Sequence, residues 1–316
     1  MNVINQKISD NYAMYHGDCV EVIKGIPDNS IHYSIFSPPF ASLFTYSDSD
    51  RDMGNCKSDQ EFQEHFQFLV DELLRVIMPG RLVSIHCMNI LATIGKDGYI
   101  GIKDFRGDII RAFQKVGFIY HSEVCIWKDP LVQATRTKAL ALAHKQISKD
   151  SSRCAMGLPD YVVTMRKVGN NPEPIAHGRG FECYYGKKNE PLDKKTNNAR
   201  DNKYSHKVWQ RYASPVWFDI NQTNTLNHNL AKEKNDERHI CPLQLDTIAR
   251  CLELWTNKGD TVLSPYAGIG SEGYQAIKME RNFIGIELKK SYYDIAVKNL
   301  NLIELAPIQE DITSCI

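Results

Sequence analysis

Four residues, Ser37-Pro38-Pro39-Phe40, place two hydrogen-bond acceptors in a stiff turn. They follow the apolar segment 31–36 directly. Two successive prolines fix φ twice, donate no backbone hydrogen bond and push Ser37 out of helical geometry. The Ser37 hydroxyl and the Pro38 carbonyl are therefore held as possible acceptors for a ligand. Taken alone, the tetrapeptide fits a rigid loop after a buried strand equally well.

A second group of candidate residues surrounds Gly268 and Gly270, which lie between a predicted strand and a predicted helix. Glycines suit a backbone that must turn tightly and approach a ligand. Glu287 ends the next predicted strand, where a carboxylate can accept hydrogen bonds from ribose hydroxyls. Glu272 would repel a pyrophosphate at the start of the helix. The pattern therefore favours a cofactor that carries ribose and a cation without phosphate, such as S-adenosylmethionine.

The overall composition hides an uneven distribution of charge. The 316 residues carry 38 Lys and Arg and 38 Asp and Glu. Between Lys128 and Arg211, however, there are 17 Lys and Arg against 8 Asp and Glu, an excess of nine positive charges. Such a segment is either an ordinary solvated face or a surface for phosphates.

Cysteines and histidines give no sign of a metal centre. The nine cysteines and ten histidines are dispersed, without a CxxC pair or an HExxH motif. We therefore expect no structural metal and no disulfide framework. No apolar run reaches the length of a bilayer span, and residues 1–15 lack the layout of a secretory signal. We expect a cytoplasmic protein.

Alternating elements predict an α/β fold with a mostly parallel sheet. The spacing of apolar residues and the Gly and Pro stops predict helices over 58–80, 105–117 and 241–259, and strands over 31–36, 81–87, 118–128 and 160–167. A strand, glycine turn, helix, strand and helix follow residue 259. From 168 to 212 no period survives. This basic insert is irregular in sequence, but its aromatic residues favour a module that is folded or that folds on binding.

In this order, the motifs resemble those of the amino-group DNA methyltransferases of the permuted β class, the cytosine-N4 and adenine-N6 family of SPPF type. The resemblance rests on 17–40, "PLQLDTIARCLEL" (242–254), "VLSPYAGIGS" (262–271) and "FIGIEL" (283–288). It implies a Rossmann-like class I methyltransferase sheet flanked by helices. It also implies a catalytic and cofactor-binding domain over 1–167 and 238–316, and a target-recognition insert over 168–237. Residues 130–158 are expected to form a helical segment that faces DNA.

The family pattern implies which residues hold S-adenosyl-L-methionine. Besides the glycines and Glu287, the matching positions are Asp18, Pro242, Leu243, Ser264, Pro265, Tyr266 and Ser271. Asp18 could equally cap a helix, and Tyr266 could simply pack in the core. Ser264 stands where the family usually has aspartate, and Ile240 where it often has proline; both departures affect the expected contacts to the cofactor.

The resemblance also explains the proline turn. If Ser37 Oγ and the Pro38 carbonyl accept the two hydrogens of an exocyclic amino group, the nitrogen lone pair can point at the methyl donor. Phe40 would stack on a target base rotated out of the duplex, and Pro39 keeps the turn rigid. Alignment of this kind can remove roughly 7–11 kcal/mol of barrier and requires no metal.

Several residues are candidates for contacts to double-stranded DNA. Those expected to grip phosphates are Arg136, Lys138, Lys187, Lys188, Lys194, Lys195, Arg200, Lys203, Lys207 and Arg211. Residues 42–62 are expected to form a mobile loop over the site, in which Tyr46, Arg51 and Asp52 either touch DNA or are solvated. His86 and Asn89 are weaker site candidates at the end of the 81–87 strand.

The choice of target base stays open between cytosine N4, which a serine before the prolines favours in this family, and adenine N6. Three other classes are compatible with parts of the pattern: a non-catalytic nucleic-acid-binding protein with the same fold, an NAD-dependent dehydrogenase, and an RNA or protein methyltransferase. The dehydrogenase would leave the proline turn and the basic insert unexplained. A homodimer and a cognate restriction endonuclease are further partners that the resemblance suggests, and it also implies a bacterial or bacteriophage origin.

Overall fold

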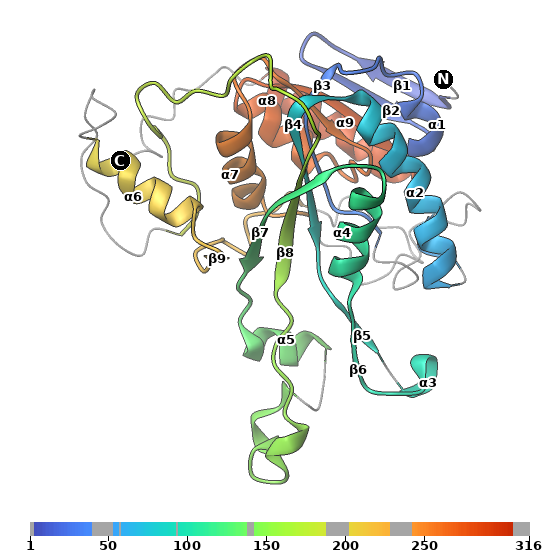
Figure 1. Cartoon of the computed structure of the whole chain (residues 1–316), viewed down its shortest axis with the longest axis vertical. Coiled ribbons are helices and arrows are strands. Elements are labelled where there is room, and N and C mark those ends of the chain that lie inside the picture. The colour runs from blue at the N-terminus through green and yellow to red at the C-terminus, as the bar shows by residue number, and fades with distance from the viewer. Residues whose placement is uncertain are drawn as a thin grey trace.

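One large sheet with helices on both faces organises the chain in this computed structural model, which describes residues 3–39, 53–56, 58–92, 94–137, 142–187, 202–227 and 242–305 (Figure 1). Within these residues the nine strands stand in the order β1 (Asn5–Ile8), β2 (Tyr12–His16), β11 (Asn282–Glu287), β10 (Thr261–Ser264), β3 (Ile31–Phe36), β4 (Ile77–Cys87), β8 (Asp160–Arg166), β7 (Ile119–Ile126) and β9 (Val216–Trp217). Strands β2, β11, β10, β3 and β4 pair in parallel, and β8 is antiparallel to both of its neighbours. The predicted mostly parallel α/β sheet is confirmed.

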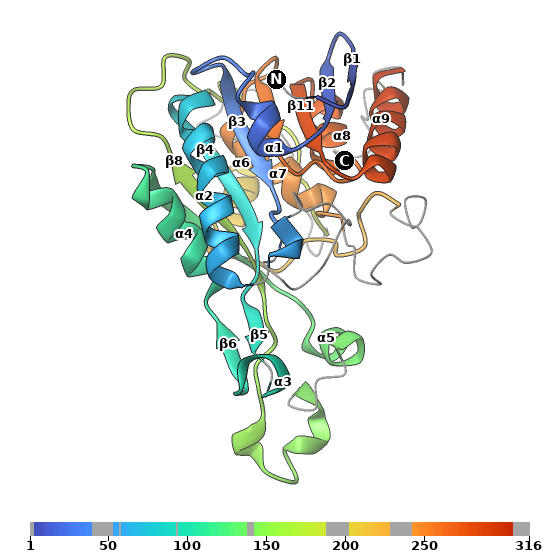
Figure 2. The same ribbon diagram turned by 90° about the vertical axis from the view of Figure 1, so that its right-hand side faces the viewer.

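Helices divide between the two faces of the sheet (Figure 2). One core contains residues of α1 (Cys19–Ile23), α2 (Asp59–Val76) and α4 (Phe105–Lys115). The other contains residues of α7 (Leu245–Trp255), α8 (Ser271–Lys278) and α9 (Lys290–Leu305). Two buried layers of this kind are what an α/β sheet requires to remove both of its faces from water.

Helix α2 shows how local chemistry sets these elements. Ser58 caps its start by accepting a hydrogen bond from the Glu61 backbone N–H at 3.1 Å, and Phe62 and Phe66 on its apolar face are fully buried. The prediction that this helix extends to residue 80 is wrong, because it ends at Val76 and β4 begins at Ile77. Pro79 explains the early end, since a proline disfavours helical geometry in the preceding residue.

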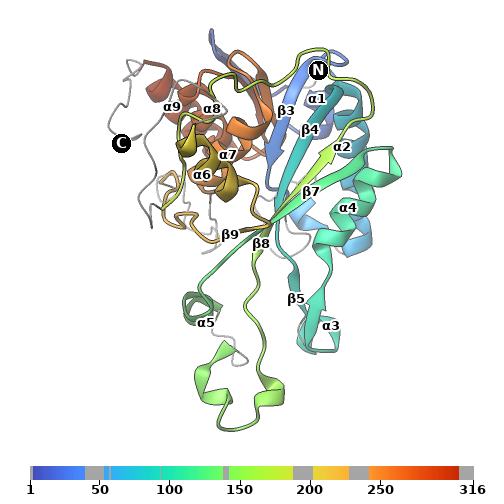
Figure 3. The same cartoon turned by 60° about the vertical axis from the view of Figure 1, so that its left-hand side comes forward.

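The predicted irregular insert contains a helix, α6 (Lys203–Tyr212), which lies beside α7 (Figure 3). Tyr204, Val208 and Tyr212 from this helix are buried against Phe181 and Tyr184. The insert therefore has a small core of its own, and several of its aromatic residues are packing residues.

A buried arginine of α7 joins this small core to the body of the protein. Arg250 is 0% exposed, and its guanidinium lies 5.0–5.5 Å from the ring centres of Tyr184, Tyr212 and Trp217. Its Nη2 atom lies 2.8 Å from Asp219 Oδ1. The charge is thus compensated by a carboxylate and by aromatic faces.

Two segments extend beyond the carboxyl ends of β4 and β7, and we call them the two arms (Figures 1 and 3). The first arm, residues 88–104, contains the antiparallel strands β5 (Ile90–Ala92) and β6 (Gly101–Lys103) and the short helix α3 (Ile94–Asp97). The second arm, residues 127–159, contains α5 (Pro130–Thr137) and the 3₁₀ turns η4 (His144–Gln146) and η5 (Ser151–Arg153). The helical prediction for the second arm is therefore confirmed only in part.

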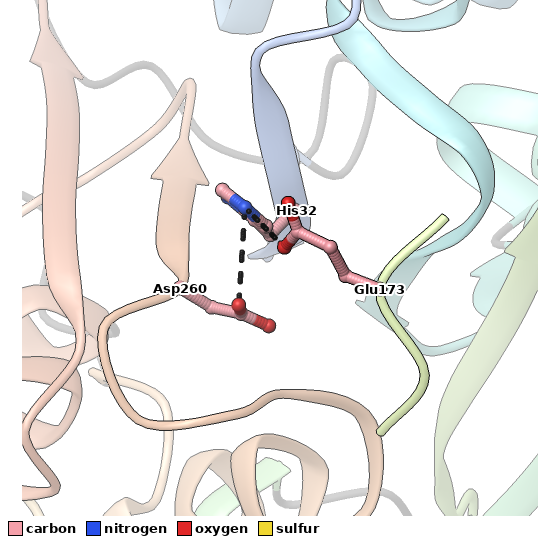
Figure 4. A group of neighbouring side chains, drawn as sticks. All are labelled: His32, Glu173 and Asp260. Carbon is pink, nitrogen blue, oxygen red and sulfur yellow. Dashed lines mark ion pairs between the residues drawn. The ribbon is translucent and has the colours of Figure 1, made fainter. Parts of the chain in front are cut away.

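An ion-pair network lies at the opposite, amino-terminal edge of the sheet (Figure 4). His32 Nε2 is 3.3 Å from Glu173 and 3.8 Å from Asp260, and Arg81 Nη1 is 2.9 Å from Asp260 Oδ2. Together, the imidazole of His32 and the carboxylates of Glu173 and Asp260 have the composition of a metal site. However, the Thr261 N–H donates to His32 Nδ1, which leaves the hydrogen of a neutral ring on Nε2, and Arg81 already supplies the cation. We interpret the cluster as a structural link between the sheet and the segment after β8.

Among the described residues, no helix combines the length and the apolar character needed to cross a bilayer.

Candidate active site

The two motifs singled out in the sequence meet at the carboxyl edge of the sheet, which we call the rim. Strand β3 leads into Ser37, and its neighbour β10 leads into the glycine loop; the two strands pair in parallel through Val262 and Leu263. The Phe36 and Tyr266 rings, which flank the two turns, have centroids 5.8 Å apart. The two motifs therefore lie next to each other at the rim. Phe40 lies outside the described residues.

The glycine loop has the backbone that its sequence predicted. Gly268 has φ +52°, with open space where a Cβ would stand, and Gly270 has φ +86° at the start of α8. A Cβ on Gly270 would come within 3.3 Å of Ala296. Positive φ favours glycine at both positions, and the space at Gly268 allows a ligand to approach the main chain.

Glu287 is oriented by main-chain donors. The Gly268 N–H donates to Oε2 and the Lys289 N–H to Oε1, each at 2.8 Å. Asp18 begins the helix after the adjacent strand β2, and its Oδ1 accepts from the Val20 N–H at 2.9 Å. The helix-cap reading of Asp18 is thus confirmed, and its expected contact to the cofactor stays a prediction.

The other predicted cofactor residues gather around the same loop. Ser264 is fully buried at the end of β10, and its Oγ has no hydrogen-bond partner among the described residues. Such an orphaned polar atom fits a cofactor that supplies the missing partner. Ser271 is the buried first residue of α8, and Pro265 lies between Ser264 and the tyrosine. Tyr266 packs partly buried against the core, and its hydroxyl contacts Met53 Sδ at 3.0 Å.

Pro242 and Leu243 precede α7, whose first N–H, on Leu245, donates to the Asn224 carbonyl. Leu243 is buried in the core. Its side chain therefore contributes packing, and both residues stay proposed cofactor contacts.

The environment of Glu272 does not fit the sequence argument, which assumed a charged carboxylate. The side chain is 4% exposed, and burial raises the pKa of its carboxyl to about 8. At neutral pH the group is therefore mostly protonated, and the repulsion of a pyrophosphate is weaker than the sequence argument assumed. The physical reason is desolvation, which disfavours the charged form.

Ser37 contacts a histidine that the sequence marked only as a weak candidate. Ser37 Oγ lies 3.1 Å from His86 Nδ1 and 3.2 Å from the His86 carbonyl oxygen. Asn89, the other weak candidate, accepts a hydrogen bond from the Arg106 N–H at 3.1 Å and so supports the first turn of α4. The structure brings His86 to the site and assigns Asn89 a structural contact.

Two residues that sequence reasoning missed lie behind His86. His86 Nε2 is 3.2 Å from Asp160 Oδ2, a close approach that does not meet the geometry of a hydrogen bond, and Lys128 Nζ is 2.5 Å from Asp160 Oδ1. Burial alone would raise the pKa of Asp160, but His86 and Lys128 hold it below its ordinary value. The available signal was an acidic residue opening the predicted 160–167 strand.

The predicted DNA-binding residues are dispersed. Lys203 and Lys207 are exposed on α6, and Lys187 is exposed in the segment before it. Arg211 Nη1 lies 3.7 Å from the buried carboxylate of Asp219, so part of its charge is compensated. Arg136 belongs to α5. The other predicted contacts, Lys138, Lys188, Lys194, Lys195 and Arg200, lie outside the described residues, as do Tyr46, Arg51 and Asp52.

A parallel sheet with a glycine loop after one strand and an acidic residue at the end of the next has the architecture of the class I methyltransferases. The family model for DNA methylases, covering N6 and N4 amino-methyltransferases, matches residues 31–298 and thus includes both motifs. The chain belongs to this family. It is a DNA amino-methyltransferase of the cytosine-N4 or adenine-N6 type, and its methyl donor is S-adenosyl-L-methionine.

Individual relatives agree with this assignment. The chain is 23% identical to the type II methyltransferase M.MjaI of Methanocaldococcus jannaschii, over 93% of both chains. It is also 23% identical to the type II methyltransferase M.BglI of Bacillus subtilis, over 91% of this chain and 85% of that protein. Its fold is similar to that of the cytosine-N4-specific PvuII DNA methyltransferase, with a TM-score of 0.62 at 16% identity, over 98% and 92% of the two chains. A Thermus thermophilus protein solved with S-adenosyl-L-methionine has a TM-score of 0.61 at 18% identity, over 94% and 97%.

Proposed function

We propose that this protein is a site-specific methyltransferase that modifies the N4 amino group of cytosine in duplex DNA. The observation that carries the proposal is the Ser37–Pro38 turn at the rim, next to the β10 glycine loop. A serine presents one short hydroxyl acceptor to an amino group. The fold similarity to a cytosine-N4-specific enzyme is consistent with this target.

The residues of this chain would act by alignment. Gly268, Gly270, Glu287 and the orphaned Ser264 hydroxyl would hold the cofactor, which supplies an electrophilic methyl group on a sulfonium. Ser37 Oγ and the Pro38 carbonyl would accept the two amino hydrogens, and this draws the nitrogen away from planarity and exposes its lone pair. Fixed acceptors stabilise the positive charge that develops on nitrogen, because they need no reorganisation during the reaction.

The target base must leave the helix for this geometry to be reached. An exocyclic amino group inside a stacked duplex cannot reach Ser37 at the rim. We therefore propose base flipping, with Phe40 as the stacking partner. Pro39 would keep the turn rigid for the incoming base.

We propose that DNA contacts both arms as well as the predicted insert over 168–237. The arms extend beyond the rim, where the base must enter, whereas α6 of the insert lies beside α7 (Figure 3). The second arm carries the exposed side chains of Lys145, Lys149 and Arg153, which suit phosphate contacts. Catalysis is assigned to residues 1–167 and 238–316.

Adenine N6 is the alternative target, because one hydroxyl and one carbonyl can accept the hydrogens of either amino group. Expression in a host that lacks DNA methylation, followed by sequencing of modified bases and mass spectrometry of nucleosides, separates the two. We expect N4-methylcytosine at one recognition sequence. N6-methyladenine would show that the target base is wrong. Resemblance to type II methyltransferases also suggests a restriction endonuclease of the same specificity, which modified DNA should resist.

A further inference from the structure

The Ser37 hydroxyl is the first member of a chain of polar side chains that leads away from the rim into the protein. Ser37 Oγ contacts His86 Nδ1 at 3.1 Å, His86 Nε2 faces Asp160 Oδ2 at 3.2 Å, and Asp160 Oδ1 pairs with Lys128 at 2.5 Å. His86 is 9% exposed and Asp160 is 2% exposed. A hydroxyl, an imidazole and a buried carboxylate in this order form a path for a proton.

Methyl transfer to an amino group creates a proton that has to leave. When the nitrogen lone pair forms its bond to the methyl carbon, the nitrogen carries two hydrogens, the methyl group and a positive charge. The Pro38 carbonyl can accept a hydrogen bond but is too weak a base to keep the proton. The Ser37 hydroxyl can take the proton only if it gives up its own hydrogen.

We propose that His86, held by Asp160, accepts this proton through Ser37 Oγ. One proton passes from the methylated nitrogen to Oγ while the Oγ hydrogen passes to His86 Nδ1. The N–H electron pair returns to nitrogen, so the products are a neutral methylamino group, an unchanged serine and an imidazolium paired with the Asp160 carboxylate. The imidazolium later loses its proton to water, which restores the starting state.

The two contacts of Ser37 Oγ correspond to the states before and after this proton transfer. Before it, the hydroxyl hydrogen points at Nδ1, the neutral imidazole carries its hydrogen on Nε2 toward Asp160, and the Oγ lone pairs face the amino group. After it, Nδ1 donates to Oγ, and the hydroxyl hydrogen can turn to the His86 carbonyl oxygen at 3.2 Å. His86 thus positions Ser37 and also accepts the proton that Ser37 passes on. Lys128 helps to keep Asp160 ionised.

The inference rests on the proposed amino-group chemistry, and its test has to separate the two. We would compare wild type, His86→Gln, Asp160→Asn and the control His121→Gln, whose histidine is exposed on β7. The first measurement is single-turnover transfer of tritiated methyl groups to unmethylated genomic DNA. Titration with S-adenosylhomocysteine and circular dichroism check binding and folding.

We expect His86→Gln to bind S-adenosylhomocysteine as wild type does and to transfer methyl groups about 100-fold more slowly, the range typical for loss of a general base. Imidazole should partly restore the rate of His86→Ala. In spectra of ¹⁵N-histidine-labelled wild type, the His86 signal, assigned by its loss in His86→Gln, should show a neutral ring protonated on Nε2. Asp160→Asn should alter this tautomer.

Three results would each overturn the proposal. They are a His86→Gln enzyme as fast as wild type, a slow His86→Ala enzyme that imidazole does not rescue, and a His86 ring protonated on Nδ1. These outcomes differ from failure of the proposed function: a wild type that methylates adenine corrects the target base and leaves the relay test intact.

Discussion

Glu272 provides a quantitative test of the environment behind the glycine loop. Its carboxyl is buried, which raises its pKa from 4.5 to about 8. The folded protein therefore holds a proton that the unfolded chain releases above pH 4.5. Its contribution to stability is fully present below pH 4.5 and is lost as the pH rises toward 8. Since one pKa unit corresponds to about 1.4 kcal/mol, the complete loss is about 5 kcal/mol, of which about 2.5 kcal/mol falls between pH 6 and 8.5.

The perturbation is Glu272→Gln, which keeps the shape and removes the titration. Urea unfolding at pH 6, 7 and 8.5 should show that wild type loses about 2.5 kcal/mol relative to the variant over this range. Glu64→Gln, at an exposed position on α2, serves as the control, and its unfolding free energy should change with pH as that of wild type does. Parallel curves for Glu272→Gln and wild type would refute the reasoning, since they would mean that burial does not keep this carboxyl protonated.

Four further predictions address the site, the fold and the DNA surface. Ser37→Ala should bind the cofactor normally and lose most methyl transfer in a radiolabel assay; near-normal turnover would remove Ser37 from the mechanism. Gly268→Asp should weaken S-adenosylmethionine binding at least tenfold in calorimetry, because a residue with a side chain is strained by about 1–2 kcal/mol at φ +52°. Unchanged affinity would show that the cofactor does not bind at this loop. Arg81→Met should cost about 3–5 kcal/mol of unfolding free energy, because the buried Asp260 carboxylate loses its guanidinium partner, and a loss below 1 kcal/mol would contradict that interpretation. Neutralising the four lysines of 187–195 should weaken DNA binding and reduce the salt slope by about 0.9 per lost phosphate contact; an unchanged slope would place DNA on the two arms alone.

Much of the site could be predicted from the sequence because its determinants are local. Two prolines after a strand stiffen a turn wherever that turn lies, and glycines between a strand and a helix allow positive φ at Gly268 and Gly270. The order of these motifs also pointed to the family. Apolar periodicity identified helices such as α4 and α7, although α2 ended earlier than predicted because of Pro79.

The tertiary structure decided the features that depend on distant residues. The aromatic residues around α6 form a core on Arg250 because the insert folds back onto α7, which no short-range pattern indicates. Asp160 reaches the rim because β8 runs antiparallel to β4, so that its first residue lies at the edge where its neighbours end. Strand order and direction are set by the packing of the whole sheet, and they alone bring Ser37, His86 and Asp160 together. The sequence by itself determined which groups could do the chemistry, and long-range pairing decided which of them are in contact.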